Sequence, residues 1–465
     1  MVRKKRINPN IFRAYDIRGI VGEDLTAESA FLVGKGIGTY LNRVNHGKIV
    51  VGGDNRTSTE FLKNAMINGL ISTGTNVIDL GLSTSPMMYV SVFKKQAIGG
   101  VNVTGSHNPI EYNGFKIVSK NAYPVSSEGI QEIRQIIETK AFISGQGEVE
   151  SHEFGDEYLD GILKRIKIGK KFRVVVDTGN GVAGKYLPRL LFEMGCFVEQ
   201  LHCDLDGNFP NHLPNPEKVE SLYHVADKVV SSRSEVGLAT DGDGDRLGLI
   251  DSNGKVRTSD EILVLLERDF LRRHPGEKVL VDVKISKKVI EDIRRSGGVP
   301  FLWKTGHSLI KTKMREDNIL LGGELSGHMF VFENYYPIDD ALFTIARLLK
   351  VIEDFGSTVQ DLLADLPNYV STPLIEVYAS DRNKFAIVNA LTDEFRKKYQ
   401  VIAIDGARVE FDNGWAVIRA SNTTPNLTLR FEADTDTSLS KIEDEVYSKL
   451  NRYLRKFGEP SAKVT

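Results

Sequence analysis

The 465-residue sequence predicts an α/β protein with three topologically similar domains, each built on a mixed or parallel sheet, and a smaller C-terminal α+β domain, grouped around a central cleft. Two observations support this fold class. A pattern of strand, helix and strand recurs three times, and residues 370–465 break its rhythm. The composition, with 41% hydrophobic and 26% charged residues, is ordinary for a globular chain of several domains.

Each repeat opens with a short run of β-branched and aliphatic residues that starts at a basic residue and ends at an aspartate, at 48–54, 173–177 and 278–282. Such runs are typical of buried parallel strands. A helix-length stretch follows each run and ends at a glycine suited to a left-handed cap, at Gly74, Gly195 and Gly297. A second strand comes next, at 76–80, 197–201 and 299–303.

A third strand in each repeat leads into a loop of unusual sequence: TGSHNP at 104–109, TDGDGDR at 240–246 and GGELSGH at 322–328. In open α/β sheets, ligands bind beyond the carboxyl ends of the strands. We therefore expect the three loops to surround one cleft. The alternative is that strand ends enter polar loops in any protein, which explains the position of these loops but not their chemistry.

The last part of the chain has short strands with period-two alternation and one long helical stretch, which predicts an α+β layer with an antiparallel sheet. A fourth unusual loop, RASNTTPN at 419–426, lies between two of these strands. The predicted domains, each carrying one of the four loops in chain order, span residues 1–150, 151–252, 253–369 and 370–465.

Charge and cysteine usage limit the possible partners and the location. Sixty basic and 62 acidic residues give a formal charge of −2, so nothing in the net charge favours binding to nucleic acid or to an anionic membrane. Cys196 and Cys203 are the only cysteines and read as buried small hydrophobes in a reducing compartment. The basic start lacks an apolar signal core, and no apolar run reaches the ~18 residues of a membrane span. We expect a cytoplasmic protein.

The run DGDGDR is the strongest candidate for a metal site. It places Asp241, Asp243 and Asp245 at alternate positions with only glycine between them. In an extended segment alternate side chains project to one side, so three carboxylates converge on a single cation while the glycines let the backbone bend. Oxygen ligands favour Mg²⁺ over zinc or copper.

Two other interpretations of this run are possible. A calcium-binding EF-hand loop requires glycine at its sixth position and glutamate at its twelfth, where this chain has Arg246 and Ser252, so that interpretation fails. A solvated acidic turn without a bound ion stays open from these six residues alone.

The loop TGSHNP presents Ser106 and His107 directly after a strand. A serine in this place is open to phosphorylation or can act as a nucleophile beside a base. Adjacent residues often point apart, however, and a serine that caps a turn is the more common case. The nucleophile interpretation therefore depends on the metal site lying nearby.

The loop GGELSGH carries Glu324 and Ser326 at alternate positions, with His328 at its end. A carboxylate that accepts hydrogen bonds from vicinal hydroxyls, with a serine beside it, suits a sugar. The alternative is a helix N-cap at Ser326, and the sequence does not separate the two.

The loop RASNTTPN combines one permanent cation with hydroxyl, amide and backbone donors, a set suited to a phosphate: Arg419, Ser421, Asn422 and Thr423. A surface arginine in a serine or asparagine turn is the alternative. Weaker signals are Tyr15 and Arg18 in AYDIRG, and Lys304, His307 and Lys311 around a glycine turn.

In this order, AYDIRG, TGSHNP with NGFK, DGDGDR, KTGHSLIK, GGELSGH and RASNTTPN resemble the motifs of the α-D-phosphohexomutase family across nearly the whole chain. The similarity is greatest to the bacterial phosphomannomutase/phosphoglucomutase group, in which three domains share a topology and a fourth closes the cleft. The resemblance implies an isomerase that moves a phosphoryl group between the 1 and 6 positions of mannose or glucose phosphates. It also implies a phosphoserine, one Mg²⁺ per active site, and a hexose 1,6-bisphosphate as intermediate and activator.

By this resemblance Ser106 is the phosphoserine and binds Mg²⁺ together with Asp241, Asp243 and Asp245. Such a concentration of negative charge requires cations nearby, for which Arg18, Lys116 and Arg246 are the candidates. Lys116 and His328 are candidates for proton transfer to and from the sugar hydroxyl, and His107 completes the expected catalytic group. The expected substrate-binding residues are Tyr15, Lys284, Thr305, Gly306, His307, Glu324, Ser326, Arg419, Ser421, Asn422 and Thr423.

The intermediate must be presented in two opposite orientations, so we expect a mobile cleft in which one phosphate site accepts either end of the sugar. Leu325 and the asparagine in the fourth loop point to mannose and glucose phosphates and away from a phosphoglucosamine mutase, which stays an alternative. A sugar-phosphate sensor without turnover is a further alternative. The expected partners are small hexose phosphates, with no nucleic acid and no membrane, and the protein is expected to be a monomer or a small homo-oligomer.

Overall fold

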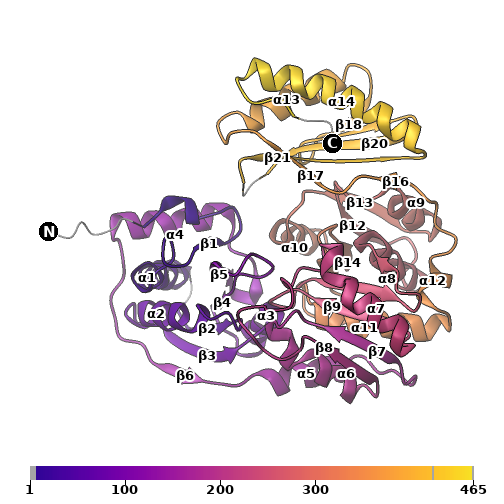
Figure 1. Cartoon of the computed structure of the whole chain (residues 1–465). Coiled ribbons are helices and arrows are strands. Elements are labelled where there is room, and N and C mark those ends of the chain that lie inside the picture. Colours follow the sequence, from indigo (N-terminus) through magenta and orange to yellow (C-terminus); the bar gives the residue numbers. More distant parts are fainter. Residues whose placement is uncertain (1–6, 45, 422–423, 463–465) are drawn as a thin grey trace.

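The computed structural model describes residues 7–44, 46–421 and 424–462. Four sheets follow one another along the chain, and we call the units built on them domains I to IV (Figure 1). Domains I to III lie side by side, and domain IV sits against domain III (Figure 1). Among the described helices, none has the length and apolar composition needed to cross a membrane.

Domain I has strands β1 (Ile17–Ile20), β2 (Lys48–Gly53), β3 (Asn76–Leu82), β4 (Gly99–Val103), β5 (Tyr112–Ser119) and β6 (Val149–Ser151). Its helices are α1 (Ala27–Val44), α2 (Thr59–Ile71), α3 (Ser85–Lys94) and α4 (Ser127–Thr139), with 3-10 turns at Pro9–Ile11 and Lys120–Ala122. Domain II has strands β7 (Arg173–Asp177), β8 (Phe197–Leu201), β9 (Val236–Thr240), β10 (Leu247–Asp251) and β11 (Val256–Arg257). Its helices are α5 (Gly155–Leu163), α6 (Leu187–Glu193) and α7 (Tyr223–Ser232), with 3-10 turns at Val182–Lys185 and Val219–Leu222.

Domain III has strands β12 (Lys278–Asp282), β13 (Val299–Trp303), β14 (Leu321–Gly323) and β15 (Met329–Val331). Its helices are α8 (Ser259–Arg273), α9 (Lys287–Arg295), α10 (His307–Glu316), α11 (Ala341–Phe355) and α12 (Val359–Leu362). Domain IV has strands β16 (Val370–Ser371), β17 (Ile375–Tyr378), β18 (Gln400–Ile402), β19 (Ala407–Phe411), β20 (Gly414–Ala420) and β21 (Asn426–Ala433), with helices α13 (Lys384–Phe395) and α14 (Asp436–Lys456).

The first three sheets share one strand order, β5-β4-β2-β3, β10-β9-β7-β8 and β15-β14-β12-β13. In each, the first strand of the repeat pairs in parallel with the second and the third, and a fourth strand returns antiparallel to the third. This confirms the predicted fold class of three similar mixed sheets. The fourth sheet is antiparallel throughout, as predicted for the α+β domain.

The three glycines predicted to end the first helix of each repeat do have left-handed backbones, with φ of +82° at Gly74, +91° at Gly195 and +81° at Gly297. A residue with a Cβ is strained in this region, so the glycines allow each chain to turn from helix into the second strand. The two cysteines are free and buried, as predicted, and burial raises the pKa of Cys196 to about 11 and that of Cys203 to about 12.

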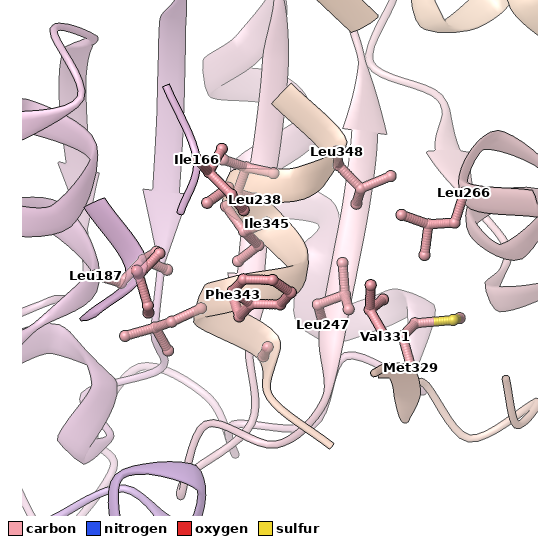
Figure 2. Close-up of a cluster of buried hydrophobic side chains, with 14 of the residues drawn as sticks. Ile166, Leu187, Leu238, Leu247, Leu266, Met329, Val331, Phe343, Ile345 and Leu348 are labelled. Atoms are coloured by element: carbon pink, nitrogen blue, oxygen red, sulfur yellow. The ribbon is translucent and has the colours of Figure 1, made fainter. Parts of the chain in front are cut away.

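One apolar cluster runs through domains I, II and III, joining for example Val50, Leu238 and Leu263. Helix α11 belongs to domain III by sequence but packs on α6 of domain II as well as on α8 and β15. Figure 2 shows part of this shared core. Strand residues of domains II and III, namely Leu238, Leu247, Met329 and Val331, lie near Phe343, Ile345 and Leu348 of α11. Burial of so much apolar surface between the domains holds them as one body.

Domain IV has a core of its own, between its sheet and helices α13 and α14. It meets domain III through a small cluster in which Trp415 and Val417 pack on Val283. The guanidinium of Arg408 lies 3.8 Å from the Trp415 ring and donates hydrogen bonds to the carbonyls of Val283 and Ile285, at 2.8 and 2.7 Å. The link between domain IV and the body therefore combines this small apolar cluster with polar bonds, which include those of Arg430 to the Lys284 carbonyl and to Asp260.

Candidate active site

The antiparallel return strand of each repeat turns the predicted loop into the tip of a β-hairpin. The run DGDGDR forms a tight turn between β9 and β10, so the expected extended segment is wrong. Gly244 has φ of +75°, and one carboxylate oxygen of Asp241 accepts the backbone N–H groups of Asp245 and Arg246 at 3.0 and 3.2 Å. The turn still gathers the carboxylates, because ligand atoms of Asp241, Asp243 and Asp245 lie within 4.8 Å of one another.

Lys116 on β5 joins domain I to this cluster. Its ammonium lies 2.6 Å from Asp243 Oδ2 and 2.5 Å from Asp245 Oδ2. Burial on its own would lower the pKa of Lys116, but Asp243 and Asp245 outweigh it and raise this pKa well above its usual value. Burial and the other two carboxylates raise the pKa of Asp241 well above the usual value. The ionised form of Asp241 is therefore unfavourable unless further positive charge lies beside it.

The aspartate cluster fits a hard cation. Oδ1 of Asp243 and Oδ1 of Asp245 are buried and have no hydrogen-bond partner among the described residues. Buried carboxylate oxygens without partners are costly, and a divalent cation satisfies them while relieving the repulsion among three acids. These residues could thus hold a metal ion, and their all-oxygen donor set suits a hard divalent cation.

Ser106 lies against this cluster from the opposite domain. Its hydroxyl donates to Asp241 Oδ2 at 2.8 Å and lies 3.1 Å from His107 Nδ1. The backbone of Ser106 has φ of +50°, which only a small fraction of non-glycine residues adopt. Burial, followed by the charges of Arg246 and Arg18, lowers the pKa of His107 well below its usual value, so this imidazole is neutral.

Arg246 connects the second loop to the third. Its Nε donates to His328 Nε2 at 3.0 Å, and its Nη1 lies 3.2 Å from Glu217 Oε2. A ring nitrogen that accepts a hydrogen bond carries no proton, so the hydrogen bond from Arg246 places the His328 proton on Nδ1, 2.9 Å from Asp339 Oδ2. Arg18 donates to the carbonyl of Gly105 at 2.8 Å, beside the serine.

Asp339 is shared by three basic groups. Lys311 contacts one of its oxygens at 2.6 Å, and His307 Nδ1 lies 3.6 Å from the other. The His307 and His328 rings are stacked with centroids 5.1 Å apart. Burial, and then the Lys311 charge, lower the pKa of His307 well below its usual value, so His307 is a second neutral imidazole of the site.

The third loop has two buried groups that no described residue satisfies. Glu324 Oε2 and Ser326 Oγ are buried and have no hydrogen-bond partner in the described parts of the chain. The loop is a hairpin turn between β14 and β15, closed by a bond from Glu324 N to the His328 carbonyl, so the helix N-cap interpretation of Ser326 is wrong. Lys284 lies 3.9 Å from Glu324 Oε1. Together these groups can receive the hydroxyls of a ligand.

The glycine turn before α10 brings Thr305, Gly306 and Tyr15 together. Thr305 Oγ1 donates to Asp282 Oδ2 at 3.0 Å. Gly306 has φ of +124°, and a Cβ added there would lie 3.1 Å from the Tyr15 ring, so only glycine fits this approach. The Tyr15 and His307 rings are 6.5 Å apart.

Domain IV reaches the same loops through Asp405. Its Oδ2 accepts from Arg419 Nε at 3.0 Å and from the backbone N–H of Thr305 at 3.1 Å. The backbone N–H of Ser421 donates to the carbonyl of Asn426, across the loop that follows β20. The predicted phosphate ligands Asn422 and Thr423 lie outside the described residues.

The sequence interpretation missed several residues that shape this site. Ser85 donates to Asp243 Oδ2 at 2.5 Å, and Asp339 and Asp405 hold His328 and Arg419. Arg56 binds the backbone of the serine loop. These residues stand in ordinary sequence surroundings, so only their position in space distinguishes them.

Comparison with known proteins places the chain in one family. The sequence matches the phosphoglucomutase/phosphomannomutase alpha/beta/alpha domain I over residues 9–144, domain II over 156–254, domain III over 258–369 and the C-terminal domain over 374–449. The chain therefore belongs to the phosphoglucomutase/phosphomannomutase family and is an enzyme, an isomerase, which confirms the resemblance predicted from the motifs.

Full-length relatives support this assignment. A phosphomannomutase/phosphoglucomutase of Pseudomonas putida is 43% identical over 444 residues, covering 95% of this chain and 96% of its own. A phosphoglucomutase of Neisseria gonorrhoeae is 38% identical, covering 94% of this chain and 96% of its own. A crystal structure of a phosphoglucomutase/phosphomannomutase family protein from Burkholderia thailandensis has a TM-score of 0.90 and 37% identity, over 96% of this chain and 98% of that one. An N-acetylphosphoglucosamine mutase of Aspergillus fumigatus shares the fold, with a TM-score of 0.60 at 15% identity over 98% and 95% of the two chains.

Proposed function

We propose that this enzyme moves a phosphoryl group reversibly between the 1 and 6 positions of mannose or glucose phosphates, through a phosphoserine at Ser106 and a hexose 1,6-bisphosphate. The observation that carries the proposal is the contact across domains I and II, where the Ser106 hydroxyl lies 2.8 Å from Asp241 in a buried acidic cluster. A serine alone is a poor nucleophile, and a dianionic phosphoserine needs neutralising charge. This site offers both a neutral base and a set of cations.

Ser106 is the residue that carries the phosphoryl group, and His107 is the neutral imidazole at 3.1 Å that can accept the serine proton when the group returns. The Asp241 carboxylate holds the hydroxyl in place from the other side. Lys116 is fixed as an ammonium by two carboxylates, and His328 has its lone pair engaged by Arg246. Because its pKa is raised, Lys116 holds its proton firmly and is suited to supply fixed positive charge, while His328 is suited to orient Arg246.

A bound Mg²⁺ would be held by Asp241, Asp243, Asp245 and an oxygen of Ser106, and it would neutralise charge on the transferred group. Arg18 and Arg246 supply fixed positive charge on the two sides of the serine loop. Phosphoryl transfer depends on positioning and charge neutralisation more than on covalent chemistry, and these residues provide both.

The sugar binds between Glu324 and Ser326. Among the described residues, Glu324 Oε2 and Ser326 Oγ have no hydrogen-bond partner, so they can bond to sugar hydroxyls, and Lys284 lies beside Glu324. Tyr15, Thr305, Gly306 and His307 line the same side. Arg419 and Ser421, together with Asn422 and Thr423 beyond the described residues, bind the phosphate that is not reacting. Because the bisphosphate turns around between the two half-reactions, this phosphate site accepts either end of the sugar.

A phosphoglucosamine mutase is the alternative within the same chemistry, and a sugar-phosphate sensor is the alternative outside catalysis. Leu325 and the SNT run of the fourth loop favour mannose and glucose phosphates. Retention of Ser106 with all three aspartates favours turnover. The remaining parts of the proposal are a cytoplasmic location, a monomer or small homo-oligomer, and no nucleic-acid or membrane partner.

The test compares glucose 1-phosphate, mannose 1-phosphate and glucosamine 1-phosphate as substrates, each with a trace of glucose 1,6-bisphosphate, with and without Mg²⁺. We expect conversion of the first two to the 6-phosphates, loss of activity after chelation, and recovery with Mg²⁺. Peptide mapping should find one phosphate on Ser106. Faster conversion of the glucosamine ester would establish the alternative mutase, and absence of phosphate on Ser106 would overturn the mechanism.

A further inference from the structure

Arg56 is a buried arginine whose contacts converge on the serine loop. It follows β2 and is only 3% exposed. Its Nη2 donates to the carbonyls of Ser106 and Asn108 at 2.8 and 2.7 Å. Its Nη1 donates to the carbonyls of Pro109 and Tyr112 at 2.8 and 3.1 Å. One guanidinium therefore binds four backbone carbonyls of the segment that carries the proposed phosphoserine.

Asp54 holds the same segment from the other side. One of its oxygens accepts from Thr104 Oγ1 at 2.7 Å and from Gly105 N at 3.1 Å, and lies 3.4 Å from Arg56 Nε. Gly105 gives the guanidinium its room, since an added Cβ would lie 2.4 Å from Arg56 Nε. Position 105 therefore lies directly against Arg56.

Domain II covers Arg56 with an aromatic ring. The Arg56 guanidinium lies 4.9 Å from the centre of the Phe209 ring, and Phe209 is buried. The chain before Phe209 passes so close to the turn around Arg56 that a Cβ on Gly207 would lie 2.3 Å from the Asn55 carbonyl. A ring face over a desolvated guanidinium is favourable and limits its motion. The Arg56 guanidinium is thus held in place by domain II while it binds the backbone of domain I.

We propose that Asp54, Arg56 and Phe209, which we call the Arg56 clamp, form a positioning device for phosphoryl transfer, an inference that rests on the proposed function of Ser106. The clamp holds the serine backbone at φ of +50° so that the hydroxyl faces Asp241. A planar fork with five N–H donors can bind four carbonyls at once, whereas a lysine ammonium cannot. Loss of the clamp shifts the serine without removing any group that touches the substrate.

The clamp is tested with Arg56→Lys, Arg56→Ala and Phe209→Leu in the full chain. A displacement of about 1 Å at a reacting group costs on the order of 100-fold in rate, so we expect Arg56→Lys to lower kcat by roughly 10- to 100-fold with KM within about threefold. Phe209→Leu should lower kcat less. Guanidinium chloride at low millimolar concentration should restore part of the kcat of Arg56→Ala, because a free guanidinium can occupy the same four carbonyls.

Arg315→Lys is the matched control. Arg315 also donates to backbone carbonyls, those of Asn121, Ala122 and Pro337, and lies 4.1 Å from the Tyr123 ring, but it does not contact the serine loop. We expect Arg315→Lys to lower the melting temperature and to keep kcat within about twofold, without response to guanidinium.

The inference is overturned if folded Arg56→Lys keeps the kcat of the wild type, or if it loses no more activity than Arg315→Lys. If Arg56→Ala does not fold, Arg56→Lys and Phe209→Leu decide the question. Incorporation of phosphate into wild-type Ser106 from glucose 1,6-bisphosphate is measured in parallel. A wild type without that phosphate contradicts the proposed function itself, and a phosphorylated, active wild type with unaffected Arg56 variants contradicts only the clamp.

Discussion

Domains I to III bring their loops together from one shared apolar core, whereas domain IV brings its loop from a separate core that meets domain III through a small apolar cluster and polar bonds. The serine, the aspartates and the sugar-binding pair therefore stand on a rigid body. Arg419 stands on the unit with the smallest apolar attachment. Interfaces of this kind permit relative motion of domains, while large apolar ones do not. We infer that the chemistry is fixed in place and that closure around the ligand belongs to domain IV.

The largest expected effect lies in the rigid body. Ser106→Ala removes the proposed nucleophile, and we expect kcat to fall by at least ~10³-fold in a steady-state assay. Ser91→Ala is a suitable control, because Ser91 is also buried and its hydroxyl donates to the Met88 carbonyl of its own helix α3. Near-normal turnover in Ser106→Ala would remove the covalent step from the mechanism.

Arg419→Ala tests the contribution of domain IV. We expect affinity for the hexose phosphate to fall by roughly 2 to 3 kcal/mol, about 30- to 150-fold, with a smaller effect on kcat, because a charge-assisted phosphate contact is lost. Substrate titration by calorimetry with the inactive Ser106→Ala background measures this directly. Arg382→Ala, an exposed arginine of the same domain, should bind normally. Unchanged affinity in Arg419→Ala would exclude Arg419 from the phosphate site.

Arg408→Met tests the attachment between the two regions. It removes two charged hydrogen bonds to the Val283 and Ile285 carbonyls, and we expect about 1.5 to 3 kcal/mol less stability, confined to domain IV. Hydrogen exchange should accelerate in β19 and β20 and stay unchanged in β7 and β9. Equal acceleration in both sheets would show that the four domains unfold as one unit.

The smallest expected effect is a pH dependence within domain II. His212 Nε2 lies 3.1 Å from Asp177 Oδ2, and its Nδ1 lies 3.0 Å from the Leu213 carbonyl. Both neighbours only accept hydrogen bonds, so they favour the ring that carries two protons. Burial alone would lower the pKa of His212, but Asp177 outweighs it and raises this pKa above its usual value.

A raised folded pKa means that this pair adds stability below the unfolded pKa of about 6.5, and that the contribution is lost as the pH rises through the folded pKa. We expect the melting temperature of the wild type to exceed that of His212→Gln by about 1 to 3 °C at pH 6, and the difference to shrink by pH 9. His46→Gln, at an exposed position of domain I, should show no such change. A difference that is independent of pH would mean that His212 is neutral.

Much of the fold was predictable from the sequence, because the repeats carry strong local signals. The apolar runs, the glycines at 74, 195 and 297 and the loops after each third strand all indicate structure within a few residues. The antiparallel return strands were not predicted, although DGDGDR contains two of the Asp-Gly pairs that are typical of hairpin turns. They are the reason why DGDGDR is a turn and not an extended segment.

The candidate site divides in the same way. The sequence motifs point to the residues that would contact a ligand, such as Ser106, Asp243 and Glu324, because their unusual runs carry chemistry. Arg56 and Asp405 have no such run around them. Their importance comes from bonds to carbonyls and side chains distant in sequence, which no local pattern records.

The path of α11 has a consequence for synthesis on the ribosome. The strands of domain II are complete at Arg257, but the helix that covers part of their apolar surface begins only at Ala341. At a translation rate of about 5 to 20 residues per second, that apolar surface stays uncovered for on the order of ten seconds before α11 has been synthesised. The nascent chain therefore cannot finish its second domain before its third has been made, and during this interval it relies on chaperones or on transient collapse to avoid aggregation.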